Sequence, residues 1–282
     1  MDLRRYIESE LAEDATLPRG GASAVADGPD GYPGDRSVHV PESRVDAGTV
    51  TVTGPAGELH AYLARPPGGN GPAPAVVVVH ENKGLVPYIA DVARRLAAAG
   101  FVAVAPDLLS RLGGTGAFDS QEEVIAALAT LDGADVVADV RAVVSWVARQ
   151  DDVDAGGVAV LGFCYGGGIV WRTLTEEPQV AAGVPFYGLI PDTDSVAGIR
   201  APVLAVYGEL DQRITSMLPT IREAMERHGK EFEALVLEGA GHAFHNDTNP
   251  DRYHPEAARR AEDIAVRWLR RRLADRSRGP SA

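Results

Sequence analysis

A single cysteine lies in a turn that is suited to hold a nucleophile. Cys164 is the third residue of the segment GFCYGG at 162–167, which directly follows the apolar run VAVL at 158–161. Glycines beside a nucleophile are needed where it sits on a sharp strand-to-helix bend, because larger side chains would collide with the strand or the helix. A cysteine outside such a frame is usually an inert small hydrophobe. The frame therefore predicts that Cys164 is a thiol nucleophile.

An acid and a histidine follow the cysteine, each after a further apolar run. Asp211 comes shortly after the run at 203–206, and His242 follows the run at 234–237. A thiol has a reference pKa of about 8.5, so it needs a base to become a good nucleophile at neutral pH. We interpret His242 as that base and Asp211 as the carboxylate that orients and stabilises its ring. Weaker candidates for these two roles are Asp192, Asp194, His245 and His254.

The elements that position these residues are predicted to be parallel strands. Uninterrupted apolar runs occupy 75–79, 102–105, 158–161, 180–184, 203–206 and 234–237. Strands that are apolar on both faces need helices on both sides of the sheet, and we expect these at 87–98, 121–130, 134–149, 166–175, 215–228 and 254–275. Functional residues then gather at the carboxyl ends of the strands. The order nucleophile, acid, histidine predicts an α/β-hydrolase fold with a mostly parallel sheet.

The spacing of apolar residues also orients the first predicted helix, at 87–98. Its period places Ile89, Val92 and Leu96 toward the sheet. The same period places Asp91, Arg94, Arg95 and Ala98 on the outer side.

The N-terminal part of the chain is predicted to have a different organisation. Segments 50–53 and 59–63, joined by a Gly-Pro turn, indicate an antiparallel hairpin at one edge of the sheet. We expect one hydrolase domain at 47–282, preceded by an extension at 1–46. The extension begins with a short charged helix at 1–15 and continues as an arm rich in Gly and Pro, extended or poorly ordered. The arm either wraps over the domain or a neighbouring subunit, or forms a loose tail.

Composition excludes several classes of function. The 282 residues carry a net charge of −13, which disfavours nucleic acid and anionic membrane surfaces as partners. One cysteine excludes an internal disulfide and a multi-cysteine metal site, and no metal or organic cofactor is implied. The sequence shows neither a membrane-spanning run nor a signal peptide. We therefore expect a cytoplasmic enzyme with a small-molecule substrate, as a monomer or a homodimer.

The motifs together resemble the dienelactone hydrolase family of α/β-hydrolases, the carboxymethylenebutenolidases, over about residues 47–275. The segments that carry the resemblance are HENKGL at 80–85, PDLL at 106–109, GFCYGG at 162–167, GELD at 208–211 and GHAF at 241–244. The resemblance implies a triad of Cys164, Asp211 and His242. It also implies an oxyanion hole made by the main-chain N–H groups of Asn82 and Tyr165. Glu81 would contact the resting thiol and accept its proton when substrate binds.

The resemblance is weaker at the positions that bind substrate. Known members hold a substrate carboxylate with arginines, one of which follows the catalytic histidine, but the segment at 243–247 contains no arginine and 119–123 is acidic. Arg111 and His245 remain as candidate substrate-binding residues; Arg111 is alternatively a structural loop residue and His245 alternatively an exposed one. We predict a cysteine hydrolase that cleaves a lactone or small carboxylic ester through an acyl-enzyme. The alternatives are a broader carboxylesterase acting on neutral esters and a non-catalytic ligand-binding homologue.

Overall fold

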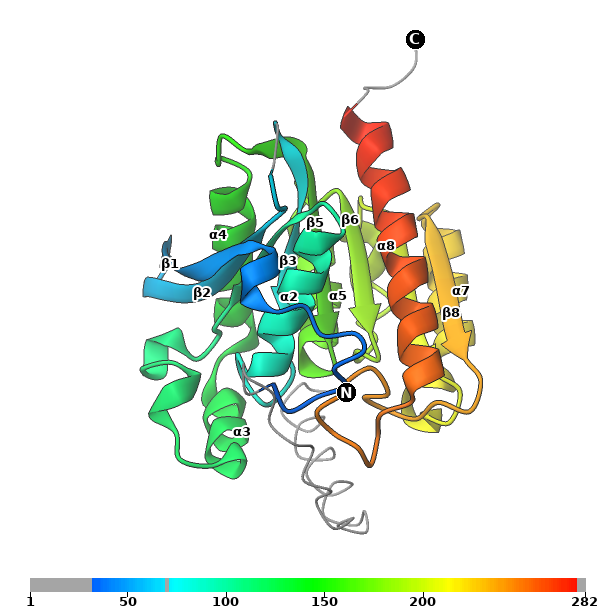
Figure 1. The fold of residues 1–282 in the computed structure, drawn as a ribbon. Coiled ribbons are helices and arrows are strands. Elements are labelled where there is room, and N and C mark those ends of the chain that lie inside the picture. Colours follow the sequence, from blue (N-terminus) through cyan, green and yellow to red (C-terminus); the bar gives the residue numbers. More distant parts are fainter. Residues whose placement is uncertain (1–31, 69–70, 278–282) are drawn as a thin grey trace.

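One sheet forms the centre of the computed structural model, which describes residues 32–68 and 71–277 (Figure 1). The helix predicted at 1–15 lies outside these described residues. Within them, eight strands follow the order β1-β2-β4-β3-β5-β6-β7-β8. They are β1 (Asp46–Gly54), β2 (Gly57–Arg65), β3 (Ala73–Val79), β4 (Val102–Pro106), β5 (Val153–Phe163), β6 (Ala182–Phe186), β7 (Val203–Gly208) and β8 (Phe232–Leu237). β2 runs antiparallel to β1 and β4 and the other pairings are parallel, which confirms the predicted sheet and its edge hairpin.

Helices cover both faces of the sheet, as strands that are apolar on both sides require. α2 (Pro87–Ala98) and α8 (Pro255–Ser277) lie over one face, whereas α4 (Gly133–Val147), α5 (Tyr165–Glu176) and α7 (Leu218–Arg227) lie over the other (Figure 1). α3 (Gln121–Thr130) lies at the end of the sheet to which β6 and β8 point, and the short α6 (Gln212–Thr215) precedes α7. In the described ranges, no helix combines the length and the apolar character that crossing a membrane would need.

Two predicted elements have different bounds in the structure. The single helix predicted at 215–228 is wrong, because α6 ends at Thr215 and α7 begins only at Leu218. Proline in the first turn of α7 is compatible with a new helix start but not with a continuous helix. The strand predicted at 180–184 begins later, since its pairing with β5 starts at Ala182.

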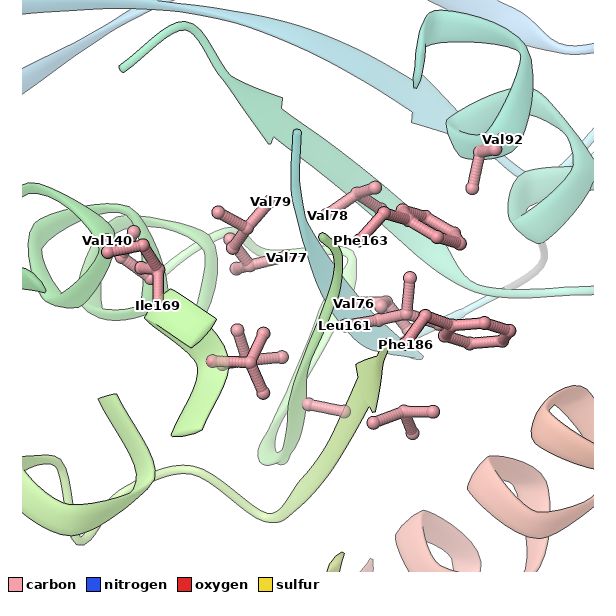
Figure 2. Close-up of a cluster of buried hydrophobic side chains, with 14 of the residues drawn as sticks. Val76, Val77, Val78, Val79, Val92, Val140, Leu161, Phe163, Ile169 and Phe186 are labelled. Carbon is pink, nitrogen blue, oxygen red and sulfur yellow. The ribbon is translucent and has the colours of Figure 1, made fainter. Parts of the chain in front are cut away.

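The core consists of two apolar layers, one on each side of the central strands. Figure 2 shows Val77 and Val79 of β3 on the side of Val140 and Ile169, which come from α4 and α5. Val78 lies with Phe163 on the opposite side, toward Val92 of α2 (Figure 2). The five valines and alanines at 75–79 are fully buried. β-Branched residues suit such a strand because they pack well on both pleated faces.

The arm in front of the sheet packs on α2 over the part that the structure describes. Residues 32–45, dark blue in Figure 1, run across α2 toward the orange loop that precedes α8. His39 Nδ1 lies 2.6 Å from Asp91 Oδ1, and Arg94 Nε donates to the carbonyl oxygen of Val40 at 2.5 Å. Asp91, Arg94 and Arg95, on the outer side of this helix, are buried, with exposed fractions of 0%, 5% and 7%. The arm covers the polar side of α2 and supplies its hydrogen-bond partners.

Tyr32 fastens the arm to the loop that follows β8. Its hydroxyl donates to Asp247 Oδ1 at 2.8 Å, and Arg95 Nη2 contacts the other carboxylate oxygen at 2.8 Å. Burial, followed by the charges of Asp91 and Asp247, holds the pKa of Tyr32 far above its usual value, so the hydroxyl keeps its proton. The arm, α2 and the loop after β8 therefore share one buried polar cluster.

We expect Tyr32→Phe to lower the free energy of unfolding by about 1–3 kcal/mol, because Asp247 stays buried with one donor fewer. Urea unfolding monitored by circular dichroism measures this loss. Tyr62→Phe is the control: its hydroxyl bonds Arg94 and Glu42 at a partly exposed site, so we expect a smaller loss. Equal losses in the two variants would contradict an anchoring role for Tyr32.

Candidate active site

Cys164 occupies the turn between β5 and α5 in a strained backbone conformation. Its φ is 51° and its ψ is −114°, values that non-glycine residues rarely adopt. The turn is held from both sides, since Cys164 N donates to the Phe186 carbonyl at 3.0 Å and Gly168 N donates to the Cys164 carbonyl at 3.1 Å. A Cβ atom at Gly162 would collide with the main chain of Gly166, and one at Gly166 would collide with that of Val79. The glycines of the motif are thus required by close backbone packing.

Backbone strain recurs in two other loops of the same rim. Among the described non-glycine residues, positive φ occurs at Cys164, at Tyr187 (φ 37°) and at Ala243 (φ 57°). Tyr187 follows β6 directly, and Ala243 directly follows His242. Such conformations cost about 1–3 kcal/mol each and persist where the surrounding structure fixes them. All three lie at the carboxyl ends of strands, where parallel sheets place their functional residues.

His242 and Asp211 form a buried hydrogen-bonded pair. Nδ1 of His242 lies 2.6 Å from Oδ2 of Asp211, and each residue is 6% exposed. The loop after β7 supplies the carboxylate and the loop after β8 supplies the imidazole. A carboxylate at Nδ1 fixes the tautomer with Nδ1–H and leaves Nε2 as the proton acceptor. Of the acids that the sequence offered, the structure pairs Asp211 with this histidine.

Tyr187 links this pair to the cysteine and to Glu81. Its ring centroid lies 5.1 Å from that of His242. The pKa of Tyr187 is raised well above its usual value, first by burial and then by Glu81, with Cys164 contributing in the same direction. The imidazole of His242 and the carboxylate of Glu81 thus adjoin the same buried tyrosine.

Two neutral side chains hold Glu81, which is only 3% exposed. Asn246 Nδ2 donates to its Oε2 at 2.6 Å, and the Tyr187 hydroxyl donates to its Oε1 at 3.4 Å. The sequence did not single out Asn246 or Tyr187. For Asn246 a signal existed, because it lies in the segment after His242 where the resembled family carries an arginine. The contact of Tyr187 with Glu81 depends on how two distant loops fold, and no local pattern indicates it.

The loop that carries Glu81 and Asn82 is braced by the PDLL segment. His80 Nδ1 lies 2.6 Å from the Glu81 carbonyl, and Leu108 N donates to His80 Nε2 at 3.1 Å. One nitrogen is therefore a donor and the other an acceptor, as in a neutral imidazole. Burial lowers the pKa of His80, which is consistent with that state. His80 fixes the loop that the sequence predicts for the oxyanion hole, in which Asn82 directly follows Glu81 and Tyr165 begins α5.

The two candidate substrate-binding residues both make contacts within the protein. Arg111 binds Asp139 of α4 through two nitrogens, at 2.8 and 2.7 Å, and also approaches Asp135. Its guanidinium is engaged in this structural pair, so we remove it from the proposed substrate site. His245 is 2% exposed and packs on Phe163 and Phe186. The alternative that His245 is exposed is therefore wrong.

Two cavities adjoin the carboxyl ends of the strands. One of about 580 Å³ is bordered by Asp211 and His242, with Arg213, Tyr253 and His254 on its other walls. The second, about 610 Å³, is lined by residues such as Gly168 of α5 and Leu189 and Ile190 after β6. Ligand pockets for small molecules usually fall in this range of volumes. Neither Cys164 nor Glu81 lines these two cavities, which therefore flank the site on either side of it.

The order of the strands, the glycine-framed turn after β5, and an acid and a histidine in the loops after β7 and β8 are those of the α/β-hydrolase fold. The chain belongs to the dienelactone hydrolase family, whose family model matches residues 59–273. This confirms the family predicted from the motifs, the fold, and an enzyme of the carboxymethylenebutenolidase type that hydrolyses esters or lactones.

Relatives and solved structures agree with this family. A Salmonella typhimurium protein named "Putative carboxymethylenebutenolidase" is 34% identical over 244 residues, which cover 82% of this chain and 90% of the relative. A Bradyrhizobium protein named "Probable 2-oxo-3-(5-oxofuran-2-ylidene)propanoate lactonase" is 37% identical over 222 residues, covering 74% of this chain and 88% of that protein. The crystal structure named "Putative Dienelactone Hydrolase" from Klebsiella pneumoniae has a TM-score of 0.74 and 32% identity, and covers 80% of this chain and 98% of its own.

Proposed function

We propose that the protein hydrolyses a lactone or small carboxylic ester with Cys164 as the nucleophile. The observation that carries this proposal is the strained backbone at Cys164, held in the turn between β5 and α5. Strain of this kind persists at functional sites, where it presents the nucleophile above the strand ends. The buried pair of His242 and Asp211 supports the same reading, since it supplies an oriented base. The lactonase and carboxymethylenebutenolidase names of relatives indicate the substrate class.

The first half of the reaction transfers the acyl group to sulfur. When substrate binds, the thiol proton passes to Glu81 and then to His242, and the thiolate attacks the carbonyl carbon. A C–S bond forms and the carbonyl electrons move to oxygen, which the N–H groups of Asn82 and Tyr165 stabilise. The tetrahedral intermediate then expels the leaving oxygen, which takes the proton from His242. The product is a thioester on Cys164; for a lactone, the freed alcohol stays attached to the acyl chain.

The second half releases the acid. His242, neutral again, removes a proton from water, and the resulting hydroxide attacks the thioester carbonyl. The C–S bond breaks, the sulfur regains a proton from His242, and the carboxylic acid leaves. Asp211 stabilises the imidazolium that forms in both halves.

The family resemblance implies that the Glu81 carboxylate contacts the resting thiol, and this contact would have a further effect in the resting enzyme. Like charges disfavour each other, so the Glu81 carboxylate opposes ionisation of Cys164 until substrate changes the geometry. The neutral donors Asn246 and Tyr187 leave the negative charge of Glu81 uncompensated. The thiol is thereby kept in its less oxidisable form while the site is idle.

A broader carboxylesterase activity on neutral esters is favoured by the charges around the site. Glu81 is bound by an amide and a phenol, and Arg95 and Arg111 are engaged with buried aspartates. We expect a short neutral ester to have a kcat/KM about tenfold or more above that of a lactone bearing a carboxylate, because the Glu81 carboxylate would repel a second carboxylate bound close to it. Initial rates on p-nitrophenyl acetate and on dienelactone provide the comparison. A clear preference for dienelactone would contradict this second candidate and leave the first intact.

Alkylation of the single cysteine tests the proposed nucleophile. We expect one iodoacetamide adduct per chain, located at Cys164, with loss of ester hydrolysis in parallel with labelling. Saturating substrate should slow both processes equally. Retained turnover in fully alkylated protein would overturn the assignment of Cys164 as the nucleophile. The mass of the adduct is the control, because it shows that the reagent reached the residue.

The remaining expectations are part of the same proposal. A catalytic thiol is best preserved in a reducing compartment, which supports the cytoplasm. The net charge of −13 supports a small-molecule partner over nucleic acid or an anionic membrane surface. The contacts of the arm with α2 support its assignment as an extension that packs on the hydrolase domain.

A further inference from the structure

Three consecutive polar residues in the loop after β8 are buried. His245, Asn246 and Asp247 are 2%, 1% and 7% exposed. Buried polar groups need hydrogen-bond partners, and these neighbours have theirs in different parts of the molecule. Asn246 donates to Glu81 at 2.6 Å, whereas Asp247 accepts from the Tyr32 hydroxyl at 2.8 Å. One peptide bond therefore separates a contact with the proposed site from a contact with the arm.

The orientation of the Asn246 amide is fixed by Thr248. Its N and Oγ1 donate to Asn246 Oδ1 at 3.0 and 2.7 Å. A main-chain N–H can only donate, so the amide atom that it meets is the oxygen, and the N–H₂ group faces Glu81. The main chain of Asn246 is held as well, because it donates to the Ala243 carbonyl and accepts from Asn249 N, both at 3.1 Å. The position of this main chain thus decides where the amide meets Glu81.

The arm holds the neighbouring carboxylate, that of Asp247. The Tyr32 hydroxyl donates to one oxygen, and Asp35 N donates to the other at 3.2 Å, which Arg95 Nη2 also contacts at 2.8 Å. A Cβ atom at Gly34 would collide with the ring of Tyr32 and with this carboxylate, so the arm lies directly against it. Asp247 is therefore clamped between the arm and α2.

The arm also binds this loop at a second point. The Tyr253 hydroxyl donates to Asp35 Oδ2 at 3.1 Å, and Tyr253 N donates to the Asn249 carbonyl at 2.9 Å. In Figure 1 the dark blue arm accordingly reaches the orange loop that precedes α8. The arm is thus bonded to the loop on both sides of the turn at 246–249.

We infer that Tyr32 is a positioning residue for Glu81, acting through Asp247 and Asn246. This inference rests on the proposed function, because the position of Glu81 affects turnover only if the thiol reacts. Without the Tyr32 hydroxyl, Asp247 keeps Arg95 as its side-chain donor and shifts toward it. The main chain of Asn246 follows, since it is the adjoining residue. Its amide then leaves the short bond to Glu81, which loses its fixed position.

Tyr32→Phe tests this inference by kinetics. We expect kcat on p-nitrophenyl acetate to fall about three- to tenfold, because a small displacement of a reacting group is costly. KM should change less than about twofold, since Tyr32 borders neither cavity beside the site. Tyr62→Phe is the control: it removes a hydroxyl that bonds Glu42, near the other end of the arm, and should keep wild-type kcat and KM.

A double-mutant cycle with Asn246→Ala tests the route. Asn246→Ala removes the donor to Glu81, so it should lower kcat at least as much as Tyr32→Phe does. In that background Tyr32→Phe should lower kcat less than about 1.5-fold further, because the contact it acts through is already gone. The loss of stability caused by Tyr32→Phe should be the same in both backgrounds. A merely structural role would leave its effect on kcat the same in both as well.

Gly34→Ala is a second variant that keeps every hydrogen-bonding side chain. Its methyl group should push the arm away from Asp247 and lower kcat on the same ester to a similar extent, again with little change in KM. If Tyr32→Phe fails to fold, as judged by circular dichroism, Gly34→Ala alone and with Asn246→Ala decides.

Wild-type kcat in folded Tyr32→Phe would overturn the inference, and so would losses in kcat that multiply in the double variant. Either result is distinct from failure of the proposed function. If iodoacetamide still inactivates Tyr32→Phe by labelling Cys164, the nucleophile stands and only the role of the arm is wrong. If fully alkylated wild-type enzyme stays active, the proposed function fails whatever the arm variants show.

Discussion

We expect Cys164→Ala to lower kcat/KM on every ester or lactone substrate by about 10⁴-fold or more, because the proposed acyl-enzyme forms on the sulfur that this substitution removes. The turn itself should persist, since alanine is smaller than cysteine and the glycines beside it are unchanged. Steady-state hydrolysis of p-nitrophenyl acetate measures the loss, and circular dichroism checks the fold. Thr173→Val is a matched control, because it is a nearly isosteric substitution at a buried position of α5, the helix that Cys164 precedes. We expect this variant to have wild-type activity.

Cys164→Ser sharpens the same prediction. A hydroxyl is a far weaker acid than a thiol, so the carboxylate of Glu81 is poorly matched to remove its proton. We expect measurable turnover that is well below that of the wild-type enzyme. Unchanged hydrolysis in Cys164→Ala would instead assign the activity to another group, or support the alternative of a pocket that only binds ligand.

We expect Asp211→Asn to lower kcat by about 10³- to 10⁴-fold while KM changes little. The asparagine amide can present its N–H₂ group to Nδ1 of His242, which stabilises the wrong tautomer and leaves the imidazolium without a counter-charge. The hydrogen bond that this substitution perturbs is 2.6 Å long and almost fully buried. Kinetics across a pH series separate this effect from substrate binding.

Asp192→Asn is the control for that variant, because Asp192 is a rival acid in the sequence. In the structure it accepts hydrogen bonds from Asp194 and Ser195 within its own turn. We therefore expect wild-type kcat for this variant. Loss of activity in Asp192→Asn together with full activity in Asp211→Asn would show that the acid is misassigned.

The sheet could be predicted because its signals are local in the sequence. Fully buried parallel strands need apolar residues on both faces. Runs such as 75–79 and 203–206, separated by helices, therefore predict such strands. The glycine frame around Cys164 is equally local, since close packing of the turn acts on neighbouring residues. Asp211 and His242 follow because parallel strands bring their ends to one rim. Their chemical roles stay predictions.

Other features depend on contacts between distant segments and could not be read from periodicity. Asp91 and Arg95 lie on the polar side of an amphipathic helix, where His39 of the arm and Asp247 of the loop after β8 are their buried partners. Arg111 looked suited to bind a carboxylate, but its partner Asp139 comes from another helix. Hydrogen-bond partners over such distances are decided by tertiary packing.

Intact-mass spectrometry of an enzyme mixed with a slowly hydrolysed ester tests the central claim most directly. The account predicts a transient adduct equal to the mass of the acyl group, mapped by peptide digestion to Cys164 and released by hydroxylamine, as a thioester is. The adduct should be missing in Cys164→Ala and present in Thr173→Val. Turnover without any acyl adduct, or an adduct on a different residue, would contradict a thiol nucleophile at the turn between β5 and α5.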